Sequence, residues 1–222
     1  TTLVEQILSS HPKVFGADEQ TFISNIISKE FGNHDLRLFF EGVINFEKKR
    51  LSEMGEYYIK LMNNISNKSE FTTDKMPENF LCIGFIKLIL PNAKIIHCHR
   101  NSKDNCLSIY KNHFPGGKIP YSYNFDNIIE YYNLYYDLMN HWNNILPKSI
   151  FNIKYEALID DSKKEITKLL NFCKLEWNDN CINFHKNKRL IKSASDVQAR
   201  SKIYSSSVNA WKNYDKYLDK YF

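Results

Sequence analysis

Residues 93–100 of the chain read AKIIHCHR, and this stretch decides the fold class. Its first six residues, AKIIHC, form a short apolar run that predicts a buried strand. Apolar residues at helical spacing precede it at residues 80–90, where Pro91 ends the pattern, and follow it at residues 101–113. A strand between two helices is the unit from which parallel α/β sheets are built.

The same alternation of helices and strands continues along the rest of the chain. Apolar periodicity predicts helices at residues 2–10, 36–65 and 124–145 and a further strand at residues 150–155. The second of these patterns forms one or two helices, broken by Asn67, and Ser162-x-x-Glu165 predicts a capping box before another helix. We therefore expect an α/β fold of three layers, with helices on both faces of a central parallel sheet and ligands at the carboxyl ends of its strands.

The composition is that of one large, folded, globular domain. The 222 residues are 43% hydrophobic, and 30 Lys and Arg against 25 Asp and Glu give a net charge of +5. The charge is dispersed rather than gathered into a basic tail, so no nucleic-acid partner is expected. No uncharged apolar run approaches the roughly 18 to 20 residues of a membrane-spanning helix, and Lys87 interrupts the most apolar stretch.

The cysteines indicate a cellular compartment, and the first residue indicates a missing amino-terminal part. The five cysteines are odd in number and form neither a CxxC pair nor a metal-ligand pattern with histidine. A reducing compartment, and hence a cytoplasmic location, is expected. The sequence begins at Thr1 inside an apolar periodic segment and without an initiator Met, so we expect a fragment whose amino-terminal part is missing.

Two junctions that lead into helices could bind an anion. Thr1 and Thr2 stand at the amino end of a helix, where free N–H groups and hydroxyls favour an anion, with a simple threonine N-cap as the alternative. A nucleotide triphosphatase would carry Lys where Thr1 stands, which disfavours ATP and GTP. At the second junction Arg100 follows the strand, and Ser108 lies about 10 Å further along the helix. Both could contact one phosphate, with a structural ion pair of Arg100 as the alternative.

Several motifs, in the right order, resemble the sulfotransferase superfamily. They are TTLVEQILSSHP at residues 1–12, DKMPENF at 74–80, AKIIHCHR at 93–100 with Ser108, YEAL at 155–158, FC-x-L-x-W at 172–177, SAS-x-x-Q-x-R at 193–200 and Y-x-SS-x-x-x-W at 204–211. The resemblance spans nearly the whole chain. It is greatest to the bacterial branch that is often fused behind tetratricopeptide repeats and is similar to tyrosylprotein sulfotransferases.

This resemblance implies a P-loop-like sulfotransferase domain over residues 1–222, with tetratricopeptide repeats a candidate for the missing upstream part. The implied donor is 3′-phosphoadenosine 5′-phosphosulfate, and no metal is required. Thr1 and Thr2 match the last two residues of the donor loop Ser-Gly-Thr-Thr, so the first strand and half of this loop would be absent from the chain. Arg100 and Ser108 match the pair that binds the 3′-phosphate.

The resemblance also implies roles for residues elsewhere. Lys75 matches the lysine that serves the leaving phosphate, and Glu19 lies where tyrosylprotein sulfotransferases carry their base, seventeen residues after the last loop threonine. The histidine base of small-molecule sulfotransferases is replaced by Pro77. Tyr155 and Ser195 match residues near the donor nucleotide and its phosphates. A surface lysine, a helix cap at Glu19 and a core tyrosine are the structural alternatives.

Two features fit the implied site less well. Ala210 stands before Trp211, where a basic residue usually contacts the donor, so Lys212 or Arg200 would have to replace it or donor affinity is weaker. His97 and His99 alternate around Cys98, and we expect one to face each side of the sheet in a structural role. No third ligand accompanies them at metal spacing.

We thus expect a sulfotransferase that acts on a protein or peptide tyrosine. A carbohydrate or small-molecule hydroxyl is the alternative acceptor. A nucleotide kinase and a non-catalytic nucleotide-binding relative are the alternative functions.

Overall fold

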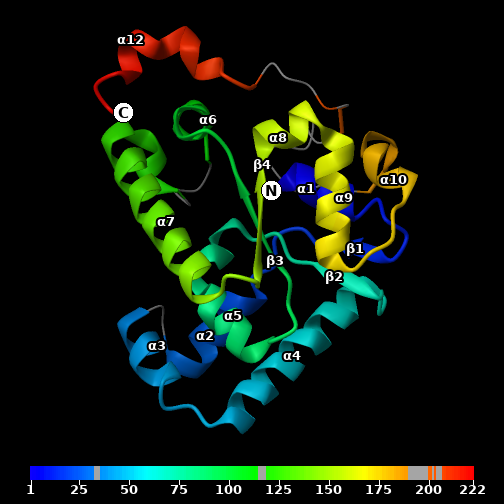
Figure 1. Ribbon diagram of the computed structural model, residues 1–222. Coiled ribbons are helices and arrows are strands. Elements are labelled where there is room, and N and C mark those ends of the chain that lie inside the picture. The colour runs from blue at the N-terminus through cyan, green and yellow to red at the C-terminus, as the bar shows by residue number, and fades with distance from the viewer. Residues whose placement is uncertain (33–35, 115–118, 190–199, 202, 204–206) are drawn as a thin grey trace. The chain divides into compact units, whose positions relative to one another are not determined.

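The structure is a computed structural model that describes residues 1–32, 36–114, 119–189, 200–201, 203 and 207–222 (Figure 1). It divides into two compact units. The first unit combines Thr1–Ile95 with Leu170–Lys202, and the second combines Ile96–Leu169 with Ile203–Phe222. Among the described residues, no helix is both long and apolar enough to cross a membrane.

The first unit is mainly helical. Its elements are α1 (Thr2–Leu8), β1 (Val14–Gly16), α2 (Phe22–Phe31), α3 (Leu36–Val43), α4 (Lys48–Ser66), β2 (Phe71–Thr73), the 3-10 helix η1 (Pro77–Cys82), α5 (Ile83–Ile89), α10 (Asp179–Ile182) and the 3-10 helix η4 (Phe184–Lys186). The chain between residues 36 and 66, for which one or two helices were predicted, forms two. The second of them ends at Asn67, which adopts the left-handed backbone conformation (φ +49°) that caps many helices.

Strands β1 and β2 form a two-stranded parallel sheet. Val14 pairs with Phe71, Phe15 with Thr72 and Gly16 with Thr73. Strand β1 is absent from the sequence prediction because three residues carry no measurable alternation. The parallel register brings the carboxyl ends of both strands to the same edge of the sheet.

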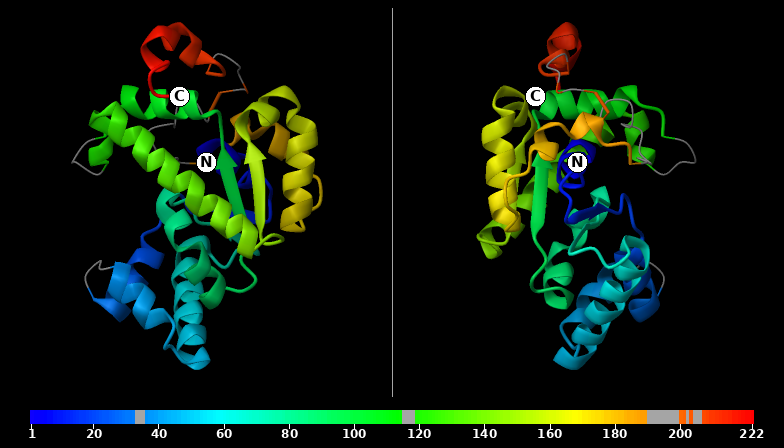
Figure 2. Two further views of the ribbon diagram at one scale, coloured as in Figure 1. Left: turned by 60° about the vertical axis from the view of Figure 1, so that its left-hand side comes forward. Right: turned by 90° about the vertical axis from the view of Figure 1, so that its right-hand side faces the viewer.

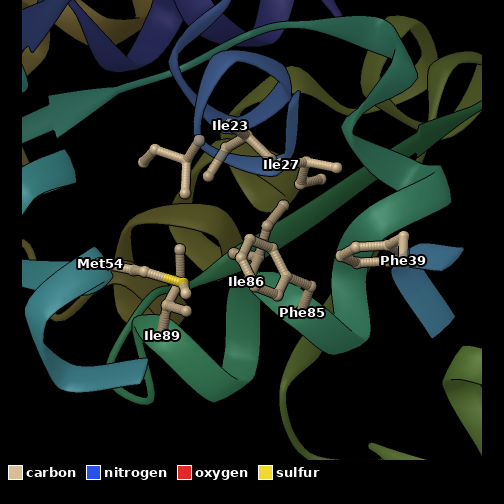
Figure 3. Packing of buried hydrophobic residues seen from close by; sticks show 8 residues of the cluster. Ile23, Ile27, Phe39, Met54, Phe85, Ile86 and Ile89 are labelled. Carbon is tan, nitrogen blue, oxygen red and sulfur yellow. The ribbon is translucent and has the colours of Figure 1, made fainter. Parts of the chain in front are cut away.

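The core of the first unit lies between helices α2, α3, α4 and α5 (Figure 3). Its buried residues are Ile23, Ile26, Ile27, Phe39, Met54, Phe85, Ile86 and Ile89. Phe39 and Phe85 meet edge to face, with ring centroids 5.3 Å apart. A Cβ at Gly55 of α4 would lie 2.0 Å from the carbonyl oxygen of Ile89, so only glycine allows α4 to pass so close to the end of α5.

The second unit contains the predicted strand AKIIHC and the elements that follow it. They are α6 (Ser102–Lys111), the 3-10 helix η3 (Pro120–Tyr123), α7 (Phe125–Ile145), β4 (Ile150–Lys154), α8 (Tyr155–Asp160), the 3-10 helix η5 (Ala210–Tyr214) and α12 (Asp215–Leu218). The unit boundaries fall within β3 (Ile95–His99) and α9 (Ser162–Cys173). Strand β3 pairs with β4, and both arrows point the same way in Figure 2.

The structure confirms the helix-rich α/β class with small parallel sheets. The elements predicted around residues 93–100 all form: β3, α6, α7 and β4 begin and end within a few residues of their predicted bounds. In the part of the chain that the structure describes, the strands form two separate two-stranded sheets.

The capping box predicted at Ser162 is wrong. Asp161 occupies the cap position, because its Oδ1 accepts a hydrogen bond from the backbone N–H of Lys164 (3.0 Å). The hydroxyl of Ser162 donates instead to the carbonyl oxygen of Leu158 (2.9 Å). An aspartate caps a helix as well as a serine does, so the pattern was displaced by one residue.

Candidate active site

Four charged residues follow the paired ends of β1 and β2: Asp18 and Glu19 after β1, and Asp74 and Lys75 after β2. We call them the strand-end cluster. The backbone N–H of Lys75 donates to the carbonyl oxygen of Asp18 (2.9 Å), which extends the pairing beyond the strands. The side-chain Nζ of Lys75 lies 2.5 Å from Oε1 of Glu19. The structure therefore brings together the two residues predicted to be catalytic.

Burial differs across this ion pair. The Lys75 side chain is 6% exposed, whereas the Glu19 side chain is 39% exposed. A lysine that is nearly buried and ion-paired is not a solvated surface charge, and Glu19 bonds to Lys75 rather than capping a helix. The ammonium group is thus fixed inside the strand-end cluster, while the carboxylate remains accessible from solvent.

Asp74 fixes the β2 side of the strand-end cluster. Its Oδ2 accepts a hydrogen bond from the Tyr58 hydroxyl (2.8 Å), and its Oδ1 accepts one from the backbone N–H of Met76 (3.2 Å). Burial raises the pKa of Asp74, and burial together with the charge of Asp74 raises the pKa of Tyr58. The residue before Lys75 is therefore held from both sides.

Glu5 attaches helix α1 to the same sheet edge. It is 3% exposed, and its Oε1 accepts hydrogen bonds from the backbone N–H of Asp18 (3.0 Å) and from the hydroxyl of Thr73 (2.7 Å). Glu5 also donates its own N–H to the carbonyl of Thr1 (3.0 Å), so the first turn of α1 is tied to the strand ends. The sequence signal was an acidic residue on the apolar face of a short helix, and it was overlooked.

Thr1 and Thr2 occupy the amino end of α1, as predicted. Thr1 is the N-cap residue, but its side chain makes no capping hydrogen bond, and Thr2 is buried. The simple N-cap alternative therefore receives no support from a side-chain contact of Thr1.

A second group of predicted residues surrounds Arg100 in the second unit. The guanidinium carbon of Arg100 lies 5.4 Å from the ring centroid of Tyr155. Its Nη2 donates to the carbonyl oxygen of Ser207 (3.1 Å), and the Tyr155 hydroxyl lies 2.8 Å from the Ser207 hydroxyl. With Asp104, these residues form what we call the arginine cluster. Tyr155 thus contacts a predicted site residue as well as packing within its unit.

Arg100 retains an unused donor. Its Nε is buried and has no hydrogen-bond partner among the described residues. The nearest carboxylate oxygen, Oδ2 of Asp104, lies 3.8 Å from Nη2, which is too long for a hydrogen bond. The Arg100 side chain as a whole is 23% exposed, so its guanidinium can be reached by an anion, and the arginine cluster is compatible with the phosphate predicted for it.

Asp104 belongs to the arginine cluster although the sequence did not point to it. Its carboxylate is buried and accepts hydrogen bonds from the backbone N–H groups of Asn209 (2.8 Å) and Trp211 (3.0 Å). It thereby holds the start of η5 against α6. Ser108 lies half-buried in α6, two turns beyond Arg100. Ser195 lies outside the described residues.

The prediction that His97 and His99 face opposite sides of the sheet is wrong. Their rings are stacked, with centroids 5.3 Å apart, because residues i and i+2 of a strand point to the same face. His97 bonds through Nδ1 to Oδ1 of Asn152 (2.7 Å) and through Nε2 to the Tyr135 hydroxyl, and burial lowers its pKa. Within the described residues, no group of three His, Cys, Asp or Glu side chains could hold a metal ion.

Comparison with known proteins places the chain in a family. A family model described as "Sulfotransferase family" matches residues 1–179. An uncharacterized protein of Aquifex aeolicus (strain VF5) is 33% identical over 225 residues, and the match covers 98% of this chain. The match covers 30% of that relative, so the chain spans less than a third of its length.

A solved structure titled "Sulfotransferase Domain from the Curacin Biosynthetic Pathway" has a similar fold. The TM-score is 0.64 at 15% sequence identity, and the alignment covers 95% of this chain and 86% of that one. The fold and the family model agree, and the family model covers most of the residues described above. This chain belongs to the sulfotransferase family.

Proposed function

We propose that this chain transfers a sulfonate group from 3′-phosphoadenosine 5′-phosphosulfate to the hydroxyl of a protein or peptide tyrosine. The observation that carries the proposal is the Lys75–Glu19 pair, whose charged atoms lie 2.5 Å apart at the ends of two paired strands. One member is a buried cation and the other a partly exposed carboxylate. An in-line group transfer needs such a pair, one group for the leaving oxygen and one for the attacking hydroxyl.

The proposed transfer assigns one proton and one charge to this pair. As the oxygen of the acceptor hydroxyl bonds to the sulfur of the donor, the carboxylate of Glu19 takes the proton of that hydroxyl. The bond from sulfur to the bridging phosphate oxygen breaks, and 3′-phosphoadenosine 5′-phosphate leaves. The ammonium group of Lys75 stabilises the negative charge that develops on the bridging oxygen. Positioning and charge neutralisation account for most of the rate, as in phosphoryl transfer.

The donor assignment rests on Arg100. We infer that Arg100 and Ser108 bind the 3′-phosphate and that Tyr155 lies near the nucleotide. The buried Nε of Arg100, which has no partner among the described residues, supports a phosphate contact there. Thr1 and Thr2 would contribute the end of the 5′-phosphosulfate loop, and Ser195 a further phosphate contact. The donor would be a co-substrate, and no metal would take part.

The tyrosine acceptor rests on Glu19. Pro77 stands where a small-molecule sulfotransferase would carry its histidine base, so we assign the base to Glu19, whose carboxylate contacts Lys75. A carbohydrate or small-molecule hydroxyl remains the alternative acceptor. Discrimination between them needs an acceptor panel.

The architecture we propose is one sulfotransferase domain that includes both units. The family model supports this, because residues 1–179 include parts of each unit. We further propose a three-layer, P-loop-like arrangement, membership in the bacterial tyrosylprotein-like branch with tetratricopeptide repeats upstream, and a cytoplasmic location.

Calorimetric titration of the full-length protein tests the donor. We expect 3′,5′-adenosine bisphosphate to bind at least about tenfold more tightly than 5′-AMP, because a phosphate held by a guanidinium contributes about 1.5 to 3 kcal/mol. Equal affinity of the two nucleotides, or no binding of either, would contradict the donor assignment.

Mass spectrometry tests the acceptor. The full-length protein is incubated with the donor and a panel of tyrosine peptides, oligosaccharides and small phenols and alcohols. A mass increase of one sulfonate on the tyrosine peptides is the expected result. Sulfonation confined to the oligosaccharides or small molecules would move the acceptor to that class, and donor binding without any transfer would indicate a non-catalytic relative.

A further inference from the structure

Arg189 makes polar contacts along its whole guanidinium group. Its Nε donates to Oε1 of Gln6 (3.0 Å), and its Nη1 donates to the carbonyl oxygen of Gly16 (3.0 Å). Its Nη2 donates to Oε2 of Glu5 (2.8 Å) and lies 3.4 Å from Oδ1 of Asp18. A second contact, also 3.4 Å, joins Nη1 to Oδ2 of Asp18. One side chain therefore joins helix α1 to the end of strand β1.

The residues in contact with Arg189 are themselves nearly buried. Glu5 is 3% exposed and Gln6 is fully buried, while the Arg189 side chain is 15% exposed. Charged groups at such depth are retained only when paired, and Arg189 faces two carboxylates. A planar fork can reach all of these acceptors at once, whereas an ammonium group cannot. Lysine could therefore replace only some of these contacts.

The backbone of Asp18 adopts an uncommon conformation. Its φ of +57° lies in the left-handed region, which few residues other than glycine adopt and which aspartate tolerates better than most. Glu5 accepts the N–H of Asp18, and Arg189 contacts its carboxylate. The peptide that is held in this way leads directly into Glu19.

The close approach of Arg189 to strand β1 also depends on Gly16. A Cβ at Gly16 would lie 2.7 Å from Nη1 of Arg189, so a side chain there would displace the guanidinium. Glycine at the last residue of β1 therefore allows the guanidinium to reach the Gly16 carbonyl.

We propose that Arg189 is a positioning residue, which holds Asp18 in its left-handed conformation and thereby places the Glu19 carboxylate against Lys75. The inference rests on the proposed function, because it gives Arg189 a role in the reaction only through Glu19. Among the described residues, the Arg189 side chain bonds to Gln6, Gly16, Glu5 and Asp18 and to neither member of the Lys75–Glu19 pair, so its effect on catalysis passes through Asp18.

The test compares Arg189→Ala and Arg189→Lys with the matched control Lys188→Ala, which removes an exposed charge from the neighbouring position. Each variant of the full-length protein is made in the wild-type and in the Glu19→Gln background. Steady-state kinetics give kcat and the KM of the donor, and thermal unfolding reports whether each variant folds.

In the wild-type background, Arg189→Ala is expected to lower kcat about 10- to 100-fold while the donor KM changes less than about threefold, because a misplaced base slows the chemical step. Arg189→Lys should recover part of this loss, and Lys188→Ala should leave kcat unchanged. In the Glu19→Gln background, Arg189→Ala should lower the residual kcat less than about twofold, because the residue it positions is already gone.

If Arg189→Ala does not fold, Asp18→Gly replaces it. Glycine adopts the left-handed conformation without strain, so this variant should fold. It also adopts other conformations and offers no carboxylate to Arg189, so Glu19 is no longer held in place and kcat should still fall at least about tenfold. An Asp18→Gly protein with wild-type kcat, or an Arg189→Ala loss of equal size in both backgrounds, would overturn the proposal.

Failure of the proposed function gives a different result. In that case the wild-type protein transfers no sulfonate, or Glu19→Gln retains full activity. An active wild-type enzyme that needs Glu19 but tolerates the loss of Arg189 would refute only the positioning role.

Discussion

The strand-end cluster and the arginine cluster satisfy their charges in different ways. In the strand-end cluster, Lys75 is paired with Glu19, and Asp74 receives hydrogen bonds from both sides. In the arginine cluster, the buried Nε of Arg100 has no partner among the described residues, and its nearest carboxylate oxygen stays 3.8 Å away.

This difference separates two kinds of functional site. A pair that must move a proton benefits from being fixed before substrate arrives, because its geometry is then set by the fold. A site that must bind an anion benefits from donors that no protein group has taken, because each donor already in use would have to be released. The strand-end cluster fits the first kind and the arginine cluster the second.

Removal of Lys75 should have the largest effect. Lys75→Ala deletes the cation that we propose stabilises the leaving group, and we expect kcat to fall about 100- to 1,000-fold with little change in unfolding temperature. Lys13→Ala is the matched control, because Lys13 forms an exposed ion pair with Glu70 (3.2 Å) at the opposite ends of β1 and β2. Steady-state sulfonate transfer compares the two variants, and equal losses of kcat would show that Lys75 acts only on the sheet.

Removal of the Arg100 guanidinium should act on binding instead. For Arg100→Ala, calorimetry should give a Kd for 3′,5′-adenosine bisphosphate that is about 10- to 100-fold weaker, with the Kd for 5′-AMP nearly unchanged. Arg100→Lys should restore little, because an ammonium group cannot reproduce two parallel N–H donors. A parallel loss of affinity for both nucleotides would mean that Arg100 supports the fold rather than the 3′-phosphate.

Replacement of Asp104 tests whether the arginine cluster depends on the carboxyl-terminal segment. Asp104→Ala leaves the N–H groups of Asn209 and Trp211 without their acceptor, and we expect a loss of about 1 to 3 kcal/mol in the free energy of unfolding. Urea denaturation measures the loss. The control is Asp219→Ala, since the Asp219 side chain is 68% exposed and lies 3.9 Å from Lys103. That variant should lose less than about 0.5 kcal/mol, and similar losses for both would deny Asp104 a special role.

From local patterns alone, the sequence predicted more of the arginine cluster than of the strand-end cluster. Arg100 could be recognised because it directly follows a strand that a short apolar run predicts, and β3, α6 and β4 form where the sequence pattern places them. Glu19 and Lys75 are 56 residues apart, and only the family resemblance joined them in advance. Their proximity depends on β1, a three-residue strand too short to leave a pattern.

The supporting residues could not be predicted for a related reason. Glu5 and Arg189 are 184 residues apart, and neither stands in a local pattern that names the other as its partner. The orientation of His97 and His99 is a different case, because the alternation of a strand was sufficient to place both rings on one face.

The smallest expected effect concerns His97, on the strand that leads to Arg100. Unlike Arg100 Nε, both ring nitrogens of His97 have partners, and burial lowers its pKa from the ordinary value of 6.5. A histidine with a lowered pKa in the folded state contributes stability that is present above about pH 6.5 and is lost as the pH falls below it, because the unfolded chain then binds more protons. Burial lowers the pKa of His99 in the same direction, so both rings contribute.

We expect the free energy of unfolding to fall by less than about 1.4 kcal/mol per pH unit for each histidine between pH 6.5 and 5. The His97→Gln variant, which keeps a hydrogen-bonding side chain but does not titrate, should show a shallower slope in urea denaturation at several pH values. An unchanged slope would mean that His97 binds protons equally in the folded and the unfolded state, and the contrast with Arg100 would then lose its basis in burial.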